Sequence, residues 1–157
     1  MKLSTKGRYA VMAMVDIAAH TEGKPIALAD VAERQEISLS YLEQLFGKLR
    51  RGGLVKSVRG PGGGYLLAHA ANATRISDII LAVDEPIKTT RCTPGSPIGC
   101  KSNKSRCLTH DLWAELGNHI FLYLNSISLA DVIDNRVLGS SGVIHRQEDD
   151  AAIAAAV

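Results

Sequence analysis

Apolar residues recur every three or four positions through the first third of the chain, which is the period of amphipathic helices. The pattern predicts a buried helix over 8–20 that ends before Gly23 and Pro25. A short helix from 28 to about 35 and, after a turn, a second helix over 39–51 follow. The inward positions of this second helix are large and apolar: Leu42, Leu45, Phe46 and Leu49. The order predicts a helix-turn-helix unit.

A β-hairpin is predicted directly after these helices. The runs 54–58 and 65–68 are short and β-prone, and Arg59 and a glycine-rich loop over 60–64 separate them. A helix-turn-helix followed at once by a hairpin is the order of a winged helix. The glycines would let the wing approach a sugar–phosphate chain, and Arg59 is placed to enter a minor groove. The loop does not have the GxxxxGK[ST] pattern of a nucleotide-phosphate loop.

The outer face of the predicted second helix carries side chains suited to reading DNA. Ser38 is its expected N-cap. Glutamine can pair with adenine edges, glutamate can accept from cytosine, and cations bind phosphates. The alternative is a solvated face of an ordinary helical hairpin. The outward residues are Ser40, Tyr41, Glu43, Gln44, Lys48 and Arg51. Lys6 and Arg8, at the start of the first helix, could also reach a phosphate.

Two more helices are predicted downstream, joined by a polar loop. A short connector helix spans roughly 76–83, and a long helix begins at Leu108. Ser128 to Asp131 has the form of a capping box and begins a last short helix. The long helix has an apolar stripe and further apolar residues beside it: Leu108, Leu112, Leu116, Ile120, Leu124 and Ile127, with Trp113, Phe121 and Tyr123. Pairing with a second copy would bury this surplus, although packing within one chain is the alternative.

Charge divides the 157-residue chain unequally. Residues 1–75 contain eleven Lys and Arg against six Asp and Glu, a net charge of +5, whereas residues 76–157 have a net charge of −3. A basic amino-terminal half suggests a nucleic-acid partner. The longest apolar runs are far too short to span a membrane, and residues 1–8 show no leader pattern, so we expect a cytoplasmic protein without a membrane partner.

All three cysteines lie within one polar loop. Cys92, Cys100 and Cys107 fall within sixteen positions, and His110 follows three residues later. Three sulfurs and one imidazole are a ligand set for tetrahedral zinc or for a [2Fe–2S] cluster, and spacing alone does not choose between them. An odd cysteine count in a solvent-rich loop argues against disulfides. Cys107 and His110 are expected to share the first turn of the long helix.

The surroundings of these cysteines predict a binding site rather than a catalytic one. The cations that flank them are expected to lower the pKa of the thiols and to offset the charge of an anionic cluster. These cations are Arg91, Lys101, Lys104 and Arg106. Four protein ligands leave no open metal position, and no activated nucleophile or carboxylate pair is recognisable, so an enzyme is not expected. A cluster carrier and a regulator stapled by structural zinc remain alternatives.

The predicted fold class is mostly α with a small β-hairpin. Residues 1–75 are expected to form the winged helix-turn-helix domain, which binds DNA. Residues 76–135 would contain the connector helix, the cluster-binding loop and the dimerisation helix. Residues 136–157, rich in Gly, Ser and Ala, are expected to be a disordered tail in which a frayed terminal helix is possible.

With these features in place, residues 1–135 resemble a bacterial family of small winged-helix transcription regulators that sense iron–sulfur clusters. Four blocks carry the resemblance: residues 3–11, 37–46, 58–67 and 107–113. It implies a homodimeric repressor or activator, bound to promoter DNA, with one [2Fe–2S] cluster per subunit on Cys92, Cys100, Cys107 and His110. Cluster status would then select promoters, including those for cluster assembly, and the assembly machinery would be the cluster donor.

The resemblance also implies which residues meet DNA. The recognition-helix contacts would be Ser38, Ser40, Tyr41, Glu43 and Gln44, with Arg59 in the minor groove. In this family the glutamate at the position of Glu43 is linked to discrimination between two classes of site. The intervals Cys-x7-Cys-x6-Cys are wider than usual in the family, and Pro94 and Pro97 lie inside them. We expect the loop to become ordered only when its four ligands bind iron, which would make it the switch.

Overall fold

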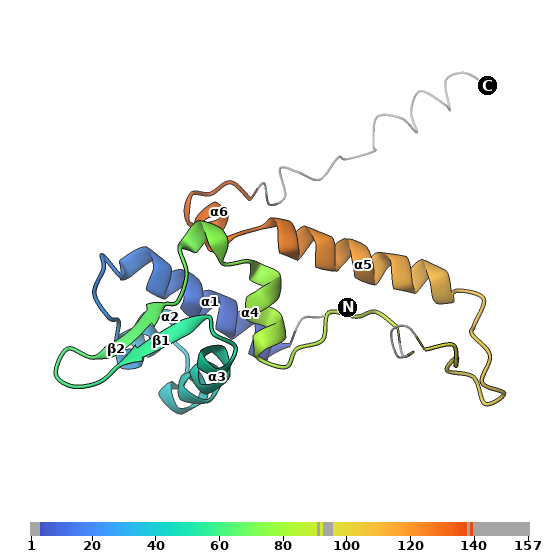
Figure 1. Cartoon of the computed structure of the whole chain (residues 1–157), viewed down its shortest axis with the longest axis horizontal. Helices are drawn as coiled ribbons and strands as arrows, with labels where there is room; N and C mark the ends of the chain where they lie inside the picture. Colours follow the sequence, from blue (N-terminus) through green and yellow to red (C-terminus); the bar gives the residue numbers. More distant parts are fainter. Residues whose placement is uncertain (1–3, 91, 93–95, 138, 140–157) are drawn as a thin grey trace, which may run out of the picture.

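The computed structural model describes residues 4–90, 92, 96–137 and 139, and they form a body of helices with one β-hairpin at its edge (Figure 1). Arg91, Pro94 and most of the predicted tail lie outside the described residues. The elements in chain order are α1 (Thr5–His20), α2 (Leu28–Gln35), α3 (Leu39–Arg51), β1 (Val55–Val58), β2 (Gly64–Leu67), the 3-10 helix η1 (Ala71–Ala73), α4 (Ile76–Ala82), α5 (His110–Ser126) and α6 (Leu129–Ile133). The predicted mostly helical class with a small β-hairpin is confirmed.

The hydrophobic core is built where α1, α3 and α4 meet. Met14 of α1, Phe46 of α3 and Ile79 of α4 are fully buried in it. Leu129 of α6 belongs to the same cluster, so one core joins residues on both sides of position 75. The division of the chain at residue 75 stays a prediction, but α4 and α6 pack on the helix-turn-helix unit and share its stability.

Antiparallel pairing of β1 with β2 forms the wing, in a register that places Val58 opposite Gly64. A short bridge adds Ile26, whose N–H donates to the Tyr65 carbonyl at 3.0 Å. A Cβ on Gly63 would collide with the Val58 carbonyl, and one on Gly64 would collide with the Ile26 carbonyl. Close approach to DNA was the predicted reason for the wing glycines, but at these two positions the contact that requires glycine is internal.

Helix α5 leaves the compact part of the molecule and extends away from it as an arm (Figure 1). Leu124 and Ile127, near its carboxyl end, pack against the core. Leu112, Leu116 and Tyr123 are exposed, and Gly117 is the buried residue of the helix. The helix begins at His110 and not at the predicted Leu108, which is fully exposed. No helix among the described residues has the length and apolar character needed to cross a bilayer.

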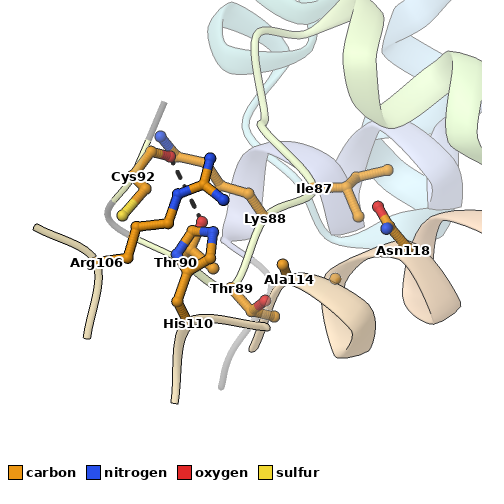
Figure 2. A pocket seen from close by; sticks show the side chains of 10 residues that line it. Ile87, Lys88, Thr89, Thr90, Cys92, Arg106, His110, Ala114 and Asn118 are labelled. Carbon is orange, nitrogen blue, oxygen red and sulfur yellow. Dashed lines mark hydrogen bonds between the residues drawn. The ribbon is translucent and has the colours of Figure 1, made fainter. Parts of the chain in front are cut away.

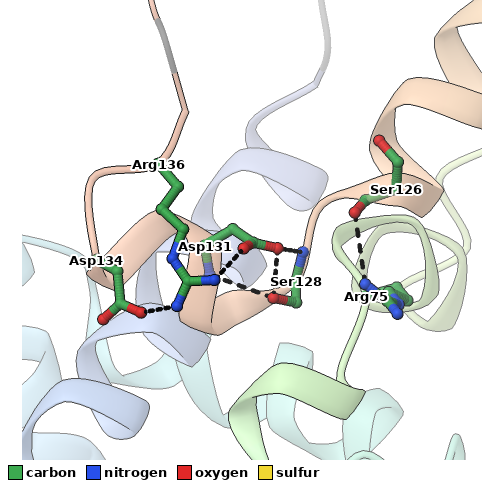
Figure 3. A network of polar contacts seen from close by, with 6 residues as sticks. All are labelled: Arg75, Ser126, Ser128, Asp131, Asp134 and Arg136. Carbon is green, nitrogen blue, oxygen red and sulfur yellow. Dashed lines mark hydrogen bonds and ion pairs between the residues drawn. The ribbon is translucent and has the colours of Figure 1, made fainter.

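The return of the chain from α5 to the core is fixed by polar contacts (Figure 3). The predicted capping box is confirmed: the Asp131 N–H donates to Ser128 Oγ at 3.2 Å, and the Ser128 N–H donates to Asp131 Oδ2 at 2.9 Å. The Ile76 N–H donates to the Ile127 carbonyl at 3.0 Å. The carboxyl end of α5 is therefore anchored beside the start of α4.

A buried carboxylate ties α1 to α2. Asp16 is 3% exposed, and it accepts hydrogen bonds from Arg34 Nη2 at 2.6 Å and from Gln35 Nε2 at 2.7 Å. Burial acts to raise the pKa of Asp16, but the hydrogen bonds from Arg34 and Gln35 and the charge of Arg34 outweigh it, so the pKa is lowered. The ionised carboxylate thus orients the first helix of the helix-turn-helix unit against α1.

We expect Asp16→Asn to lower the free energy of unfolding at pH 7 by about 2 kcal/mol, because it leaves Arg34 without its anionic partner. Urea denaturation checks this value, with the exposed Glu33→Gln as a control for charge. Because the folded pKa is lowered, the contribution is present above the unfolded pKa of about 4 and is lost as the pH falls through the folded value. A difference between variant and wild type that does not shrink at acidic pH would contradict this assignment.

Candidate metal centre and nucleic-acid interface

The four predicted ligands line one cavity at the amino end of α5. This cavity, of about 240 Å³, is bordered by Cys92, Cys100, Cys107 and His110. Its other walls are three threonines and an indole: Thr89, Thr90, Thr109 and Trp113. Side chains from three separate stretches of the loop and from α5 are thus brought together.

The ligands differ in exposure because different parts of the chain carry them. The segment over 84–92, here called the linker, follows α4, and Cys92 is buried at its end. Cys107 is half-buried and Cys100 is exposed. His110 is the first residue of α5, and its N–H donates to the Cys107 carbonyl at 3.1 Å. Cys107 therefore precedes the helix. The prediction that both residues lie in its first turn is wrong, although one backbone hydrogen bond still joins them.

The imidazole of His110 supports a ligand role. Its Nδ1 is a buried side-chain nitrogen without a hydrogen-bond partner among the described residues. A buried polar atom left unpaired costs free energy, and coordination would satisfy it. Within the same part of the chain, no three His, Cys, Asp or Glu side chains lie close enough together to hold a metal ion. The donor set fits a thiophilic centre, but the side chains share a cavity without reaching coordination distance.

The Cys100 thiol is influenced by its neighbouring thiols, and no flanking cation is among the causes of its pKa shift. The pKa of Cys100 is raised, first by its hydrogen bond with Cys92, then by burial and by the charges of Cys92 and Cys107. The prediction that neighbouring cations lower the thiol pKa is wrong at Cys100. Arg106, one of these cations, donates from its Nη2 to the Ser96 carbonyl at 2.8 Å. Metal binding would have to displace protons from this group of thiols.

A turn between Cys100 and Cys107 gives the loop local structure. The Gly99 N–H donates to the Lys104 carbonyl at 2.8 Å, and the Lys104 N–H donates to the Lys101 carbonyl at 2.8 Å. A Cβ on Gly99 would collide with the Ser105 carbonyl, so glycine is required there. The sequence interpretation missed this turn, although a glycine beside a cysteine was the available signal.

A second cavity lies between the linker and α5 (Figure 2). Cys92, Arg106 and His110 gather at one end, whereas Ile87 and Asn118 lie at the other (Figure 2). The two cavities share Thr89, Thr90, Cys92 and His110 in their walls, so they adjoin along the linker and the start of α5.

The linker rests on α5 at a glycine. A Cβ on Gly117 would lie 2.9 Å from Thr89 Oγ1 and 3.5 Å from Thr89 N. The Thr89 hydroxyl donates to the Trp113 carbonyl, which fixes the linker three residues before Cys92. Gly117 and Thr89 were missed in the sequence, where a glycine inside a predicted helix was the signal for a close approach. They position Cys92 beside His110.

The predicted DNA-reading residues are exposed, with one exception. Ser38, Ser40, Glu43 and Gln44 are exposed on α3, and Arg59 is exposed at the wing. Tyr41 is half-buried, and its ring meets that of Tyr9 edge-on at a centroid distance of 6.1 Å. The prediction that Tyr41 faces outward is therefore only partly correct.

Two details change the predicted roles of Ser38 and of the cations on α1 and α3. The N-cap position of α3 is Ser38, but its side chain makes no capping hydrogen bond and lies 3.0 Å from Ser40 Oγ instead. Lys48 is paired with Asp84, and Lys6 donates to the backbone of Asp84, so neither cation is fully free for phosphate. Arg8 is exposed.

The comparisons with known proteins now decide the family. The model of the Rrf2 family, described as iron-dependent transcriptional regulators, matches residues 3–135. The chain belongs to the Rrf2 family. It is 51% identical over 150 residues to the HTH-type transcriptional regulator IscR of Yersinia pestis, covering 96% of this chain and 88% of the relative. A regulator of the same name from Photorhabdus laumondii is 52% identical over 151 residues, with the same coverage.

Solved structures of Rrf2-type regulators share the fold. T. potens IscR is 35% identical with a TM-score of 0.69, over 92% of this chain and 93% of that one. CymR of B. subtilis, titled a global cysteine regulator, is 32% identical with a TM-score of 0.70, over 86% of this chain and 98% of that one. The chain is thus a DNA-binding transcription regulator of the Rrf2 family with a winged-helix fold.

Gly117→Val is expected to lift the linker from α5 and expose Cys92. In reduced, metal-free protein, thiol labelling followed by mass spectrometry should show the buried Cys92 reacting slowest of the three cysteines. The substitution should accelerate labelling of Cys92 by roughly tenfold, because buried thiols react only through local opening.

Leu122→Val is the matched control, since it puts the same β-branched residue on an exposed face of α5. Equal acceleration in both variants would mean that α5 has only lost helix stability. An unchanged rate of Cys92 labelling in Gly117→Val would contradict the packing of the linker against α5 at Gly117.

Proposed function

We propose that this chain is a homodimeric transcription regulator that binds one [2Fe–2S] cluster per subunit through Cys92, Cys100, Cys107 and His110. Occupancy of the cluster would decide which promoters it binds, including those of cluster assembly, and the assembly machinery would supply the cluster. The observation that supports this most is the shared cavity: all four residues line it, and the buried Nδ1 of His110 has no hydrogen-bond partner in the part of the chain that the structure describes.

Iron is favoured over zinc by the family to which the chain belongs, whose description is iron-dependent. When bound, the cluster supplies an inorganic centre whose gain or loss changes the charge and the number of bonds in the loop. Histidine is the weak ligand of the four, because its coordinating nitrogen must be unprotonated. Such a ligand lets a sensor lose its cluster at a pH within the physiological range.

A homodimer would cover the apolar surface of α5. Leu112, Leu116 and Tyr123 project from this helix with exposed fractions of 59%, 40% and 55%. Their spacing places them on one side of the helix, about a quarter-turn from the side that meets the core. A second α5 packed there would bury the stripe and place two winged units in one particle, as two-fold promoter sites require.

DNA recognition is assigned to the exposed part of α3 and to the wing. Glu43 and Gln44 are exposed polar residues in the first half of the helix, with the hydrogen-bonding groups that read base edges in a major groove. Ser38, Ser40 and Tyr41 would help to fix the helix in the groove, and Arg59 would enter the minor groove beside it. Glu43 would discriminate between classes of site, because a carboxylate accepts hydrogen bonds and repels phosphate.

We expect His110→Cys to hold its cluster more tightly than the wild type, because a fourth thiolate replaces a protonatable ligand. The measurement is the rate at which visible absorption is lost when anaerobically purified protein meets air or a chelator. The rate should fall by roughly tenfold, the usual scale of a change in metal ligation. His119→Cys adds a cysteine on an exposed part of α5 and serves as the control.

Loss of absorption at the wild-type rate in His110→Cys would contradict the assignment of His110 as a ligand. Colourless anaerobic protein that contains zinc would overturn the cluster itself and leave a structural metal in its place.

Arg59→Ala is expected to weaken binding about tenfold at sites with a narrow A·T-rich minor groove and to reduce the salt dependence by about one charge. Fluorescence anisotropy at several salt concentrations measures both. Arg136→Ala removes one cation next to α6, away from α3 and the wing, and is the control. An equal loss of affinity at G·C-rich sites would contradict entry of Arg59 into the minor groove and would mean that it contacts phosphate alone.

A further inference from the structure

Three parts of the molecule meet at two adjacent acidic residues, Asp84 and Glu85. These residues follow α4, at the point where the linker to Cys92 leaves the core. One partner is the start of α1, and another is the carboxyl half of α3. The site lies apart from the candidate metal centre and from the predicted base contacts.

The contacts to the start of α1 are hydrogen bonds. The Ser4 N–H donates to Glu85 Oε1 at 3.1 Å, and the Ser4 hydroxyl donates to Glu85 Oε2. Ser4 is also the N-cap of α1, because its Oγ accepts from the Lys6 N–H. Lys6 Nζ donates to the Asp84 carbonyl at 3.3 Å. The linker thereby bonds to the residue that begins α1.

The contact to α3 is an ion pair. Lys48 Nζ lies 2.8 Å from Asp84 Oδ2, and the Lys48 side chain is only 29% exposed. The pKa of Asp84 is lowered, first by the hydrogen bond from Lys48, then by its charge, with Lys6 and Arg51 adding to the effect. An exposed carboxylate is thus placed among cations of α1 and α3.

The backbone at this position is specialised. Asp84 has φ of 57°, in the left-handed region that only a few non-glycine residues adopt, aspartate and asparagine among them. Close by, a Cβ on Gly52 at the end of α3 would lie 3.1 Å from the Ala82 Cβ at the end of α4. The ends of α3 and α4 therefore abut where the linker turns away.

We propose that Asp84 and Glu85 form a polar junction that transmits the position of the cluster loop to α1 and to the recognition helix α3. This rests on the proposed function, since it supplies the route by which cluster status reaches the DNA surface. One exposed ion pair contributes little on its own. Here, however, the contacts to two helices come from consecutive residues. Cys92 lies seven positions after Glu85. Displacing the linker therefore acts on both helices together.

The test uses the full chain with both junction residues neutralised, Asp84→Asn with Glu85→Gln. Asparagine keeps the left-handed backbone accessible, so the variant removes charge without forcing a new turn. DNA affinity is measured by fluorescence anisotropy on cluster-loaded and cluster-stripped protein, at a promoter site where the wild type distinguishes the two forms. Asp134→Asn, which removes an exposed carboxylate paired with Arg136 far from the linker, is the matched control.

In wild type and control, the affinities of the two forms should differ at least about fivefold, the lower end of usual allosteric coupling. In the double variant this ratio should fall to about one, while the visible spectrum and the iron content stay as in the wild type. Should the double variant fail to fold, Lys48→Gln breaks the same ion pair from α3 and should also reduce the ratio.

An unchanged ratio in the double variant would overturn the junction while leaving the proposed function in place. If the affinities of both forms shift by the same factor, the ratio is likewise unchanged, and Asp84 then only screens Lys48 from phosphate. Equal affinities of the loaded and stripped forms in the wild type, at every site tried, would overturn both proposals.

Discussion

The structure depends on how a polar segment is held together without a core of its own. Among the described residues from 84 to 109, Cys92 alone is buried. Burial of apolar surface normally offsets the entropy of ordering a chain, and this segment has almost none to bury. Its order must therefore come from specific bonds: the turn over 99–105, the linker seated on Gly117, and ligands that converge on one cavity. Bonds to a cluster would be the strongest of these and would be lost as a unit.

The same segment begins and ends on the DNA-binding body. It leaves the core at Asp84, after α4, and returns along α5 to Ile127, which packs on that core. Because the segment is attached at both ends, we propose that its rearrangement acts on both attachment points. One of them carries the polar contacts to α1 and α3, and the other lies beside the first residue of α4. In the proposed account, a change in the loop therefore reaches α1 and also α3, the helix that presents Glu43 and Gln44.

Periodic positions made most of the fold predictable. The inward residues of α3, the capping box of α6 and the hairpin were found because each depends on neighbours within about four positions in the sequence or on turn chemistry. The ligand set was also recognisable, since cysteine and histidine have few other uses in such a loop. The contacts that position these four ligands could not be recognised in the sequence. Thr89 against Gly117, Ser4 against Glu85 and Lys48 against Asp84 join residues far apart in the chain, and no local pattern records them.

X-ray absorption at the iron edge, on protein purified without oxygen, tests the central claim most directly. The account predicts iron with a sulfur shell, a second iron within the same cluster, and one nitrogen per cluster that is lost in His110→Cys and replaced by sulfur. Protein that contains no iron, or iron whose shell is unchanged by that substitution, would contradict it.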